Sequence, residues 1–154
     1  MVASTHSNTI LGWREWVALP DHGVEWIKAK VDTGARTSSV HVFDVVDKGA
    51  TVAFRLYPWQ ESENDAADIE LPVHDRRTVR SSSGHEEERI VVLMQARLAG
   101  REVKIEMTLT NRDSMGFRML IGREALRQGF MVDPAKSFLG GRAPRAIRMA
   151  NRGR

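Results

Sequence analysis

The chain of 154 residues contains no cysteine. Disulfide bonds, thiolate nucleophiles, cysteine-ligated zinc and iron–sulfur clusters are therefore excluded. No apolar run approaches the roughly 18 residues that a membrane-spanning helix requires, and the polar segment 1–8 has no apolar stretch of the kind found in secretory signals. We therefore expect a cytoplasmic protein, without contact to membranes, whose single domain is stabilised by its hydrophobic core.

Signatures of cofactor and metal sites are also missing. A phosphate-binding loop would need spaced glycines followed by Lys and Ser or Thr, and the sequence has none. The nearest approach to a zinc-protease motif is the segment 85–89, in which Arg89 stands in place of the second histidine ligand. The serines at 81–83 precede His85, but they lack the glycine pattern of a nucleophile elbow. We therefore predict that the protein uses no cofactor and binds no metal.

Positive charge is concentrated at the C-terminal end of the sequence. The formal net charge is +3, from 23 basic and 20 acidic residues, and the segment 142–154 holds five arginines. We predict a domain over residues 8–140, followed by a basic, flexible tail over residues 141–154. Such a tail is suited to contact RNA or another acidic surface. It has no aromatic residue for base stacking, so nucleic acid is the less favoured partner.

Alternation of apolar and polar residues predicts a domain built from strands. Apolar residues alternate over 90–98 and again over 103–109, and Ala99-Gly100 between them predicts a tight turn of an antiparallel hairpin. The segment 24–31 alternates in the same way, with Ile27, Ala29 and Val31 on one face. Further strands are expected over 10–19, 38–46, 49–57, 68–73, 75–82, 117–121 and 130–132. One short helix is expected over 123–128, capped by Gly129.

The strand over 24–31 leads directly into Asp32-Thr33-Gly34-Ala35. In such a loop the strand end presents the carboxylate, the hydroxyl bonds within the loop, and the glycine allows close backbone approach. Two such carboxylates about 3 Å apart share one proton, so that one acts as general base on a water while the other protonates a peptide carbonyl. Read alone, the three residues are more typical of an ordinary turn than of a catalytic loop.

Four motifs in order extend this observation. They are Asp32-Thr33-Gly34-Ala35-Arg36-Thr37-Ser38, Arg80-Ser81-Ser82-Ser83-Gly84-His85, Thr108-Leu109-Thr110-Asn111-Arg112 and Arg118-Met119-Leu120-Ile121-Gly122-Arg123. Together they resemble the retropepsin-like aspartic proteases, in particular the bacterial branch labelled "ATP-dependent zinc protease". The resemblance covers about residues 10–139. It implies an all-β, closed retropepsin-like barrel with one short C-terminal helix.

The resemblance also implies roles for individual residues. Asp32, Thr33 and Gly34 would form the catalytic loop, and the segment containing Gly122 and Arg123 would pass behind that loop and support it. Because the sequence holds one Asp-Thr-Gly, the active site would need a homodimer with one aspartate from each subunit. The branch is often encoded near an ATP-grasp ligase that adds glutamates to a ribosomal protein, which implies a functional link and an acidic peptide substrate.

Arg36 departs from the retroviral pattern, in which an acid usually follows the alanine. A cation beside the paired aspartates would lower their pKa values and make a shared proton harder to keep near neutral pH. Alternatively, Arg36 extends together with Ala35 into the substrate groove and selects acidic side chains, or it is solvated or ion-paired away from the site. For Arg112, Arg118 and Arg123 two interpretations stay open: they line a cleft for acidic side chains, or they form surface pairs.

A peptidase of this kind also needs a flap that closes over the substrate. The candidate is the segment 78–90, in which Ser82, Ser83 and Gly84 would hydrogen-bond a peptide backbone, although an ordinary surface hairpin fits equally well. The leading hypothesis is therefore an aspartic-type endopeptidase that acts as a homodimer on glutamate-rich or glutamylated peptides. The alternative is a non-catalytic peptide-binding or regulatory module of the same fold.

Overall fold

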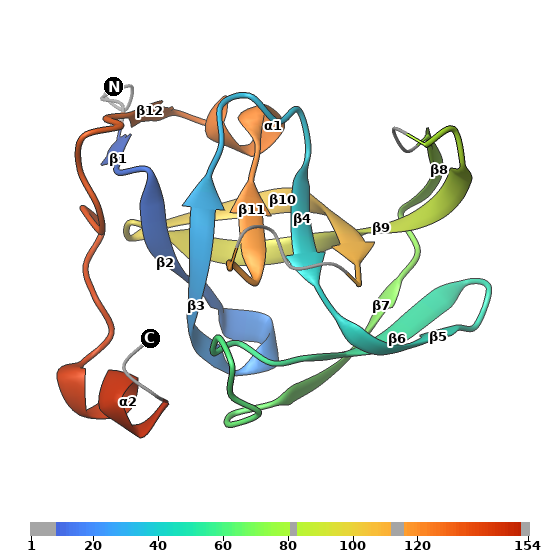
Figure 1. The fold of residues 1–154 in the computed structure, drawn as a ribbon, viewed down its shortest axis with the longest axis horizontal. Helices are drawn as coiled ribbons and strands as arrows, with labels where there is room; N and C mark the ends of the chain where they lie inside the picture. Colours follow the sequence, from blue (N-terminus) through green and yellow to red (C-terminus); the bar gives the residue numbers. More distant parts are fainter. Residues whose placement is uncertain (1–8, 81–82, 112–115, 152–154) are drawn as a thin grey trace, which may run out of the picture.

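The computed structural model describes residues 9–80, 83–111 and 116–151. Six strands form a closed ring in the order β10-β4-β11-β3-β2-β9, and β9 pairs back onto β10 (Figure 1). Their bounds are Arg14–Leu19 for β2, Val24–Val31 for β3, Ser38–His41 for β4, Glu86–Leu98 for β9, Arg101–Thr110 for β10 and Met119–Ile121 for β11. This ring confirms the predicted all-β, closed retropepsin-like barrel.

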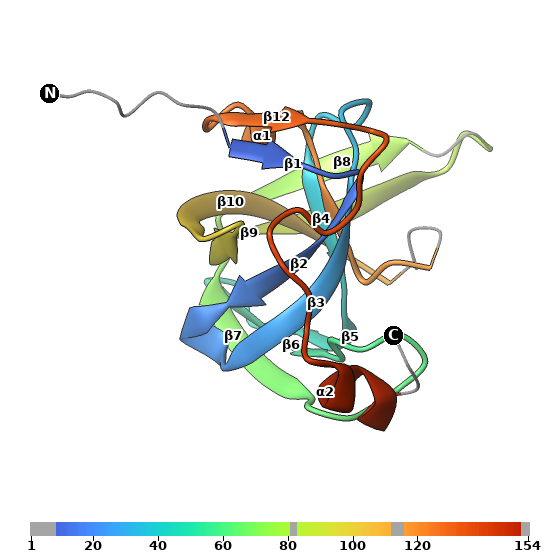
Figure 2. The ribbon, with the colours of Figure 1, turned by 90° about the vertical axis from the view of Figure 1, so that its left-hand side faces the viewer.

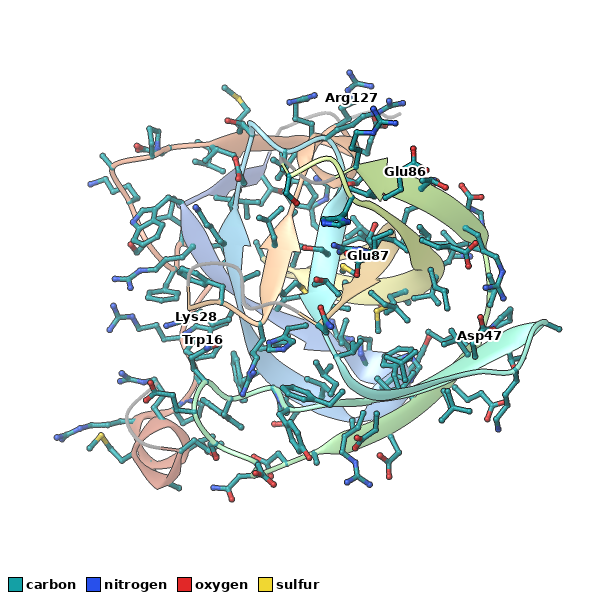
Figure 3. All side chains as sticks on the ribbon, turned by 45° about the vertical axis from the view of Figure 1, so that its right-hand side comes forward. Trp16, Lys28, Asp47, Glu86, Glu87 and Arg127 are labelled. Carbon is teal, nitrogen blue, oxygen red and sulfur yellow. The ribbon has the colours of Figure 1, made fainter. Side chains whose placement is uncertain are left out.

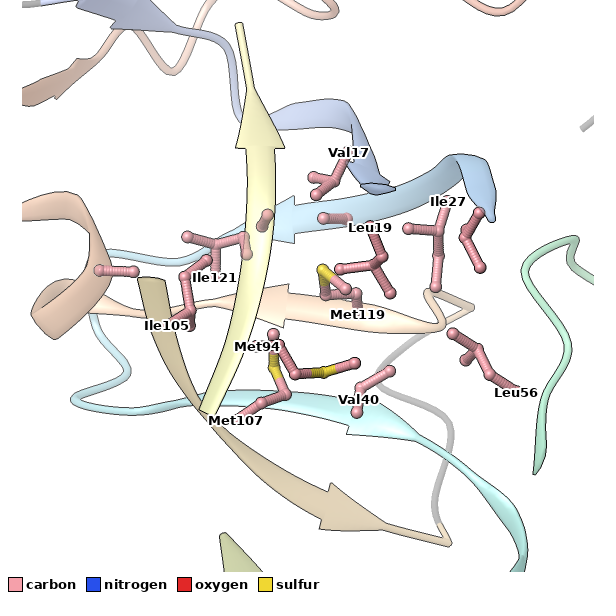
Figure 4. Close-up of a cluster of buried hydrophobic side chains, with 14 of the residues drawn as sticks. Val17, Leu19, Ile27, Val40, Leu56, Met94, Ile105, Met107, Met119 and Ile121 are labelled. Carbon is pink, nitrogen blue, oxygen red and sulfur yellow. The ribbon is translucent and has the colours of Figure 1, made fainter. Parts of the chain in front are cut away.

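The barrel interior is filled by the apolar residues of the alternating strands. Ile27 of β3, Met107 of β10 and Met119 of β11 have no more than 1% of their surface exposed, and Figure 4 shows them packed together between the strands. Burial of these side chains provides the main driving force for closing the ring. The predicted inward face of residues 24–31 and the predicted hairpin of β9 and β10 are both confirmed.

Shorter elements extend from the barrel (Figures 1 and 2). A separate antiparallel sheet has the order β5-β6-β7, β8 pairs with the outer half of β9, and β1 pairs in parallel with β12. The bounds are Thr9–Leu11 for β1, Phe43–Asp47 for β5, Thr51–Leu56 for β6, Ala67–Pro72 for β7, Asp75–Arg80 for β8 and Phe130–Val132 for β12; the helices are Arg123–Leu126 for α1 and Arg145–Ala150 for α2, with a 3₁₀ turn at Pro20–His22.

Two of the predicted strands are divided in the structure. The expected strand over 10–19 is interrupted at Gly12, where an added Cβ would lie 2.3 Å from the Lys136 carbonyl oxygen. The expected strand over 38–46 is interrupted at Val42, whose N–H donates to the Thr110 oxygen at 2.8 Å. In both places the backbone of a segment distant in sequence lies against the chain.

The C-terminal segment packs against the domain as far as residue 151. Helix α2, which the sequence pattern did not predict, contributes Ile147 to an aromatic cluster with Trp16 and Trp59. The Asn64 side-chain amide donates to the Ala150 carbonyl at 3.2 Å. The flexibility expected for residues 141–154 stays a prediction. Residues 141–151, which the structure describes, pack against the barrel. No helix in the described ranges is long and apolar enough to cross a membrane.

Candidate active site

The loop after β3 is built around the Asp32 carboxylate. The Asp32 N–H donates to the Ile121 carbonyl at 2.9 Å, so that the aspartate continues the pairing of β3 with β11. The Gly34 N–H donates to Asp32 Oδ1 at 2.9 Å, and the Ala35 N–H donates to the Asp32 carbonyl at 3.2 Å. These bonds hold the carboxylate in one orientation at the surface, where Thr33 and Gly34 are exposed.

Gly122 lies directly behind this loop. Its N–H donates to the buried Ser38 hydroxyl at 3.0 Å. A Cβ at position 122 would lie 2.5 Å from the Thr37 carbonyl oxygen and 2.9 Å from that of Ala35, so only glycine fits without movement of the backbone. The segment from β11 to α1 therefore meets the Asp32 loop in the arrangement that the resemblance implies.

Arg123 fixes the loop from the first residue of α1. Its Nη1 donates to the carbonyl oxygens of Thr33 and Gly34, both at 3.1 Å, and its N–H donates to the Ala35 oxygen at 2.8 Å. The guanidinium thus binds main-chain atoms of the loop. Of the residues predicted from sequence, the structure brings together Asp32, Thr33, Gly34, Ala35, Gly122 and Arg123. Ser38 is an addition; it lies within the first motif, but the sequence reading gave it no role.

Arg36 points toward helix α1. Its side chain is 78% exposed, and its Nε lies 3.8 Å from Glu124 Oε1. It borders a cavity of about 490 Å³ together with Arg77 and Lys104. Among the alternatives that the sequence left open, this geometry favours an Arg36 that is ion-paired outside the Asp32 loop, because the closest carboxylate to it belongs to the helix.

Basic side chains lie on the same outer face of the barrel as Asp32. Side chains alternate along a strand, so Lys28 and Lys30 share the outward face of β3 with Asp32, while Ile27, Ala29 and Val31 are buried. Arg14 of β2 lies directly opposite Lys30. Trp16 lies opposite Lys28, and Figure 3 shows this pair side by side. The sequence analysis did not assign a function to Arg14, Lys28 or Lys30. Lys28 and Lys30 could have been noticed, because they and Asp32 occupy every second position and therefore share one face of the strand.

Arg118 lies at the other end of β11 from Asp32. It is 9% exposed. Its Nη1 contacts His41 Nδ1 at 3.1 Å, its Nη2 donates to the Trp59 carbonyl at 3.4 Å, and its guanidinium covers the Phe43 ring at 5.3 Å. The structure therefore does not bring Arg118 to the Asp32 loop, because β11 is three residues long and separates the two positions.

The candidate flap is a hairpin, as predicted. β8 pairs with β9 from Asp75 opposite Val91 to Arg80 opposite Glu86, and in Figure 2 the hairpin extends beyond the barrel. Gly84, near its tip, has a φ of 87°, which favours glycine. Ser83 and Gly84 are exposed there. Ser82 lies outside the described residues.

Ion pairs fix the base of this hairpin. Arg76 of β8 donates to both carboxylate oxygens of Asp47 in β5, at 2.7 and 2.9 Å. These hydrogen bonds hold the pKa of the Asp47 carboxyl well below its usual range.

Arg112, the last of the predicted substrate-binding residues, lies outside the described residues. In the ranges that the structure describes, no group of three or more His, Asp or Glu side chains is placed to hold a metal ion.

Comparisons with known proteins agree with this geometry. The model of the RimB-like family, described as "Retropepsin-like aspartic endopeptidase RimB", matches residues 10–143. A crystal structure of a Legionella pneumophila protein of unknown function superimposes with a TM-score of 0.71 at 27% identity, covering 87% of this chain and 99% of that one.

Two curated relatives are named probable alpha-L-glutamate ligase. The one from Shewanella pealeana is 46% identical over 133 residues, which are 84% of this chain and 29% of that protein. The one from Parasynechococcus marenigrum is 44% identical over 132 residues, 83% of this chain and 28% of that protein. The chain thus spans less than a third of the length of the curated relatives it matches.

Proposed function

The chain belongs to the RimB-like family of retropepsin-like aspartic endopeptidases, and on this basis we propose that it is a cytoplasmic aspartic-type peptidase that acts as a homodimer. The observation that supports this most is the Asp32 loop, which Gly122 and Arg123 hold against the barrel. A loop whose backbone is fixed by these contacts holds its surface carboxylate in a defined place, as a catalytic group requires.

The proposed reaction uses one Asp32 from each subunit. One carboxylate, ionised, takes a proton from a water as the water oxygen attacks the peptide carbonyl carbon. The other, protonated, gives its proton to the carbonyl oxygen. The tetrahedral intermediate then collapses: the C–N bond breaks, the nitrogen leaves as an amine with a proton returned through the dyad, and a carboxylic acid is formed. Thr33 and Gly34 shape the loop that presents each carboxylate.

An exposed apolar surface supports the proposed dimer. Ile10 of β1 and Met131 of β12 lie opposite each other and are 53% and 55% exposed. These two strands form a sheet of only two among the described residues, and Figure 1 places them at the same end of the barrel as α1 and the loop after β3. A second copy that covers this sheet would bring its own Asp32 loop toward the first.

We further propose that the substrate is acidic, with glutamate-rich or glutamylated peptides as the leading class. Arg14, Lys28 and Lys30 carry positive charge along the face that presents Asp32, which favours an anionic peptide. The names of the relatives connect sequences of this kind to glutamate ligation. A functional link between this chain and such a ligase is therefore part of the proposal.

The alternative is a peptide-binding or regulatory module that does not cleave. Arg36 would favour it if its exposed guanidinium left Glu124 and turned toward the paired aspartates, where a cation would make the shared proton harder to keep. Such a module would use the same basic face and would bind acidic peptides without hydrolysing them.

The test is cleavage of a glutamate-tailed peptide from about pH 4 to pH 8, followed by mass spectrometry. We expect Asp32→Asn to lower the rate by at least about 10²-fold while leaving thermal unfolding unchanged. Asp68→Asn, an exposed aspartate of β7 paired with Arg55, is the matched control and should cleave like the wild type. Equal rates for Asp32→Asn and wild type would refute a peptidase based on Asp32. Binding by the wild type without cleavage at any pH would establish the alternative.

A further inference from the structure

A second pocket lies at the other end of β11 from Asp32. Its volume is about 450 Å³, and it is bordered by Arg118, by the loop that follows β6, and by Ala150 of helix α2. The loop contributes Ser62, Glu63 and Asn64 to this border. None of these groups takes part in the proposed peptidase reaction.

Arg118 is the unusual feature of this pocket. It is 9% exposed, and its Nε is buried without a hydrogen-bond partner. Its other polar contacts are His41 Nδ1 at 3.1 Å and the Trp59 carbonyl at 3.4 Å, and no carboxylate in the described part of the chain pairs with it. A buried charge is costly unless it is paired, and the guanidinium fork matches a carboxylate. The residue is therefore suited to receive an anionic group from outside the chain.

The rim of the pocket carries the opposite charge. Glu61 and Glu63 both border it and are exposed, and no ion pair of Glu63 occurs within the described ranges. Two acids on the rim disfavour a ligand that is only an anion, whereas a ligand with a positive group beside its carboxylate satisfies both ends of the pocket.

The loop that holds these groups is fixed in place. Ser62 Oγ accepts from the Asn64 N–H at 3.1 Å, and the Asn64 amide donates to the Ala150 carbonyl at 3.2 Å. Glu61 and Asp65 have φ values of 55° and 58°, a left-handed conformation that residues other than glycine rarely adopt. Strain of this kind persists only where surrounding contacts determine the backbone.

From these observations we propose that the Arg118 pocket binds the zwitterion of a free α-amino acid. The α-carboxylate binds the Arg118 guanidinium, and the α-ammonium group lies toward Glu63. This site is independent of the proposed peptidase activity, because it uses neither Asp32 nor the dimer.

The first test measures ligand specificity by isothermal titration calorimetry on the full chain, with L-alanine, acetate and ethylamine as probes. We expect L-alanine to bind at least about tenfold more tightly than acetate or ethylamine, because only the zwitterion makes both charged contacts. In NMR spectra, L-alanine should shift the indole N–H of Trp59, which donates to Asp65 at 2.9 Å, and leave that of Trp13 in place. Equal affinity for acetate and L-alanine, or no binding of L-alanine, would overturn the proposal.

The second test uses variants of the two charged groups. Glu63→Gln should weaken L-alanine binding about tenfold, whereas acetate should bind at least as tightly as before, because one of the acids that repel it is gone. Glu102→Gln, an exposed acid of β10, is the control and should bind like the wild type. Arg118→Gln should abolish L-alanine binding; if that variant does not fold, Glu63→Gln and the probe series decide alone. Unchanged L-alanine affinity in Glu63→Gln would contradict the assigned position of the ammonium group.

Discussion

Replacing Gly122 by alanine tests how strongly the Asp32 loop depends on the segment behind it. The added Cβ would lie 2.5 Å from the Thr37 carbonyl oxygen, 2.7 Å from the Thr37 carbonyl carbon and 2.9 Å from the Ala35 carbonyl oxygen. All three atoms are backbone, so no side-chain rotation relieves the overlap. Overpacking of this kind costs about 2 kcal/mol. For a domain of this size that corresponds to a fall in Tm of roughly 4–8 °C.

The overlap should also affect the site, because Ala35 and Thr37 belong to the loop that carries Asp32. Moving this loop by a few tenths of an ångström should lower the rate of peptide cleavage by about tenfold or more. Gly49→Ala is the control: it has a φ of 86° but open space around it, so it should lose about 1 kcal/mol through backbone strain alone and cleave normally. Thermal unfolding and peptide cleavage are measured on both variants. Wild-type stability and wild-type activity in Gly122→Ala would refute the proposed support of the loop.

Three further predictions concern single side chains. Arg123→Ala removes two charged hydrogen bonds to the loop carbonyls and should lower cleavage about tenfold. Arg127→Ala, at the C-cap of the same helix, should not. Glu15→Gln replaces a buried carboxylate oxygen that accepts two backbone N–H groups. Denaturant titrations should show a free energy of unfolding lower by about 3 kcal/mol. A loss below about 0.5 kcal/mol would contradict a stabilising role for these hydrogen bonds. The pKa of the Asp47 carboxyl is lower in the folded chain than in the unfolded one. Its stabilisation is therefore fully present above the unfolded pKa of about 4 and is lost as the pH falls from there toward the lower folded pKa. Thermal melts of Asp47→Asn and wild type should differ at pH 7 and converge in strong acid.

The strands of the barrel were predictable from local patterns, whereas the closed retropepsin-like barrel and the support of the Asp32 loop by Gly122 were implied by the family resemblance. The alternation over residues 24–31 defines an inward face, and the same alternation continues to Asp32. Gly122 follows an apolar strand in a motif whose spacing from Asp32 is read directly from the sequence. The alternation is carried by residue type and neighbours, whereas the role of Gly122 was read from the four motifs that carry the resemblance.

Other features depend on contacts that no local pattern encodes. Glu15 received no role from the sequence. It is fully buried, and Leu139 and Gly140, more than 120 residues later, donate their N–H groups to it. Arg118 was expected to line a cleft or form surface pairs, and it is buried because Trp59 and Phe43 from a separate segment cover it. Such burial is decided by the tertiary arrangement.

The central claim, a dyad made of one Asp32 from each subunit, is tested most directly by mixing subunits. A fixed amount of wild-type chain is equilibrated with an equal amount of Asp32→Asn chain, and the cleavage rate of a glutamate-tailed peptide is measured. If random pairing places half of the wild-type subunits in mixed dimers that lack one carboxylate, the rate should fall to roughly half of its starting value. A rate that stays unchanged while differently tagged wild-type and Asp32→Asn subunits co-purify as mixed dimers would contradict the shared dyad.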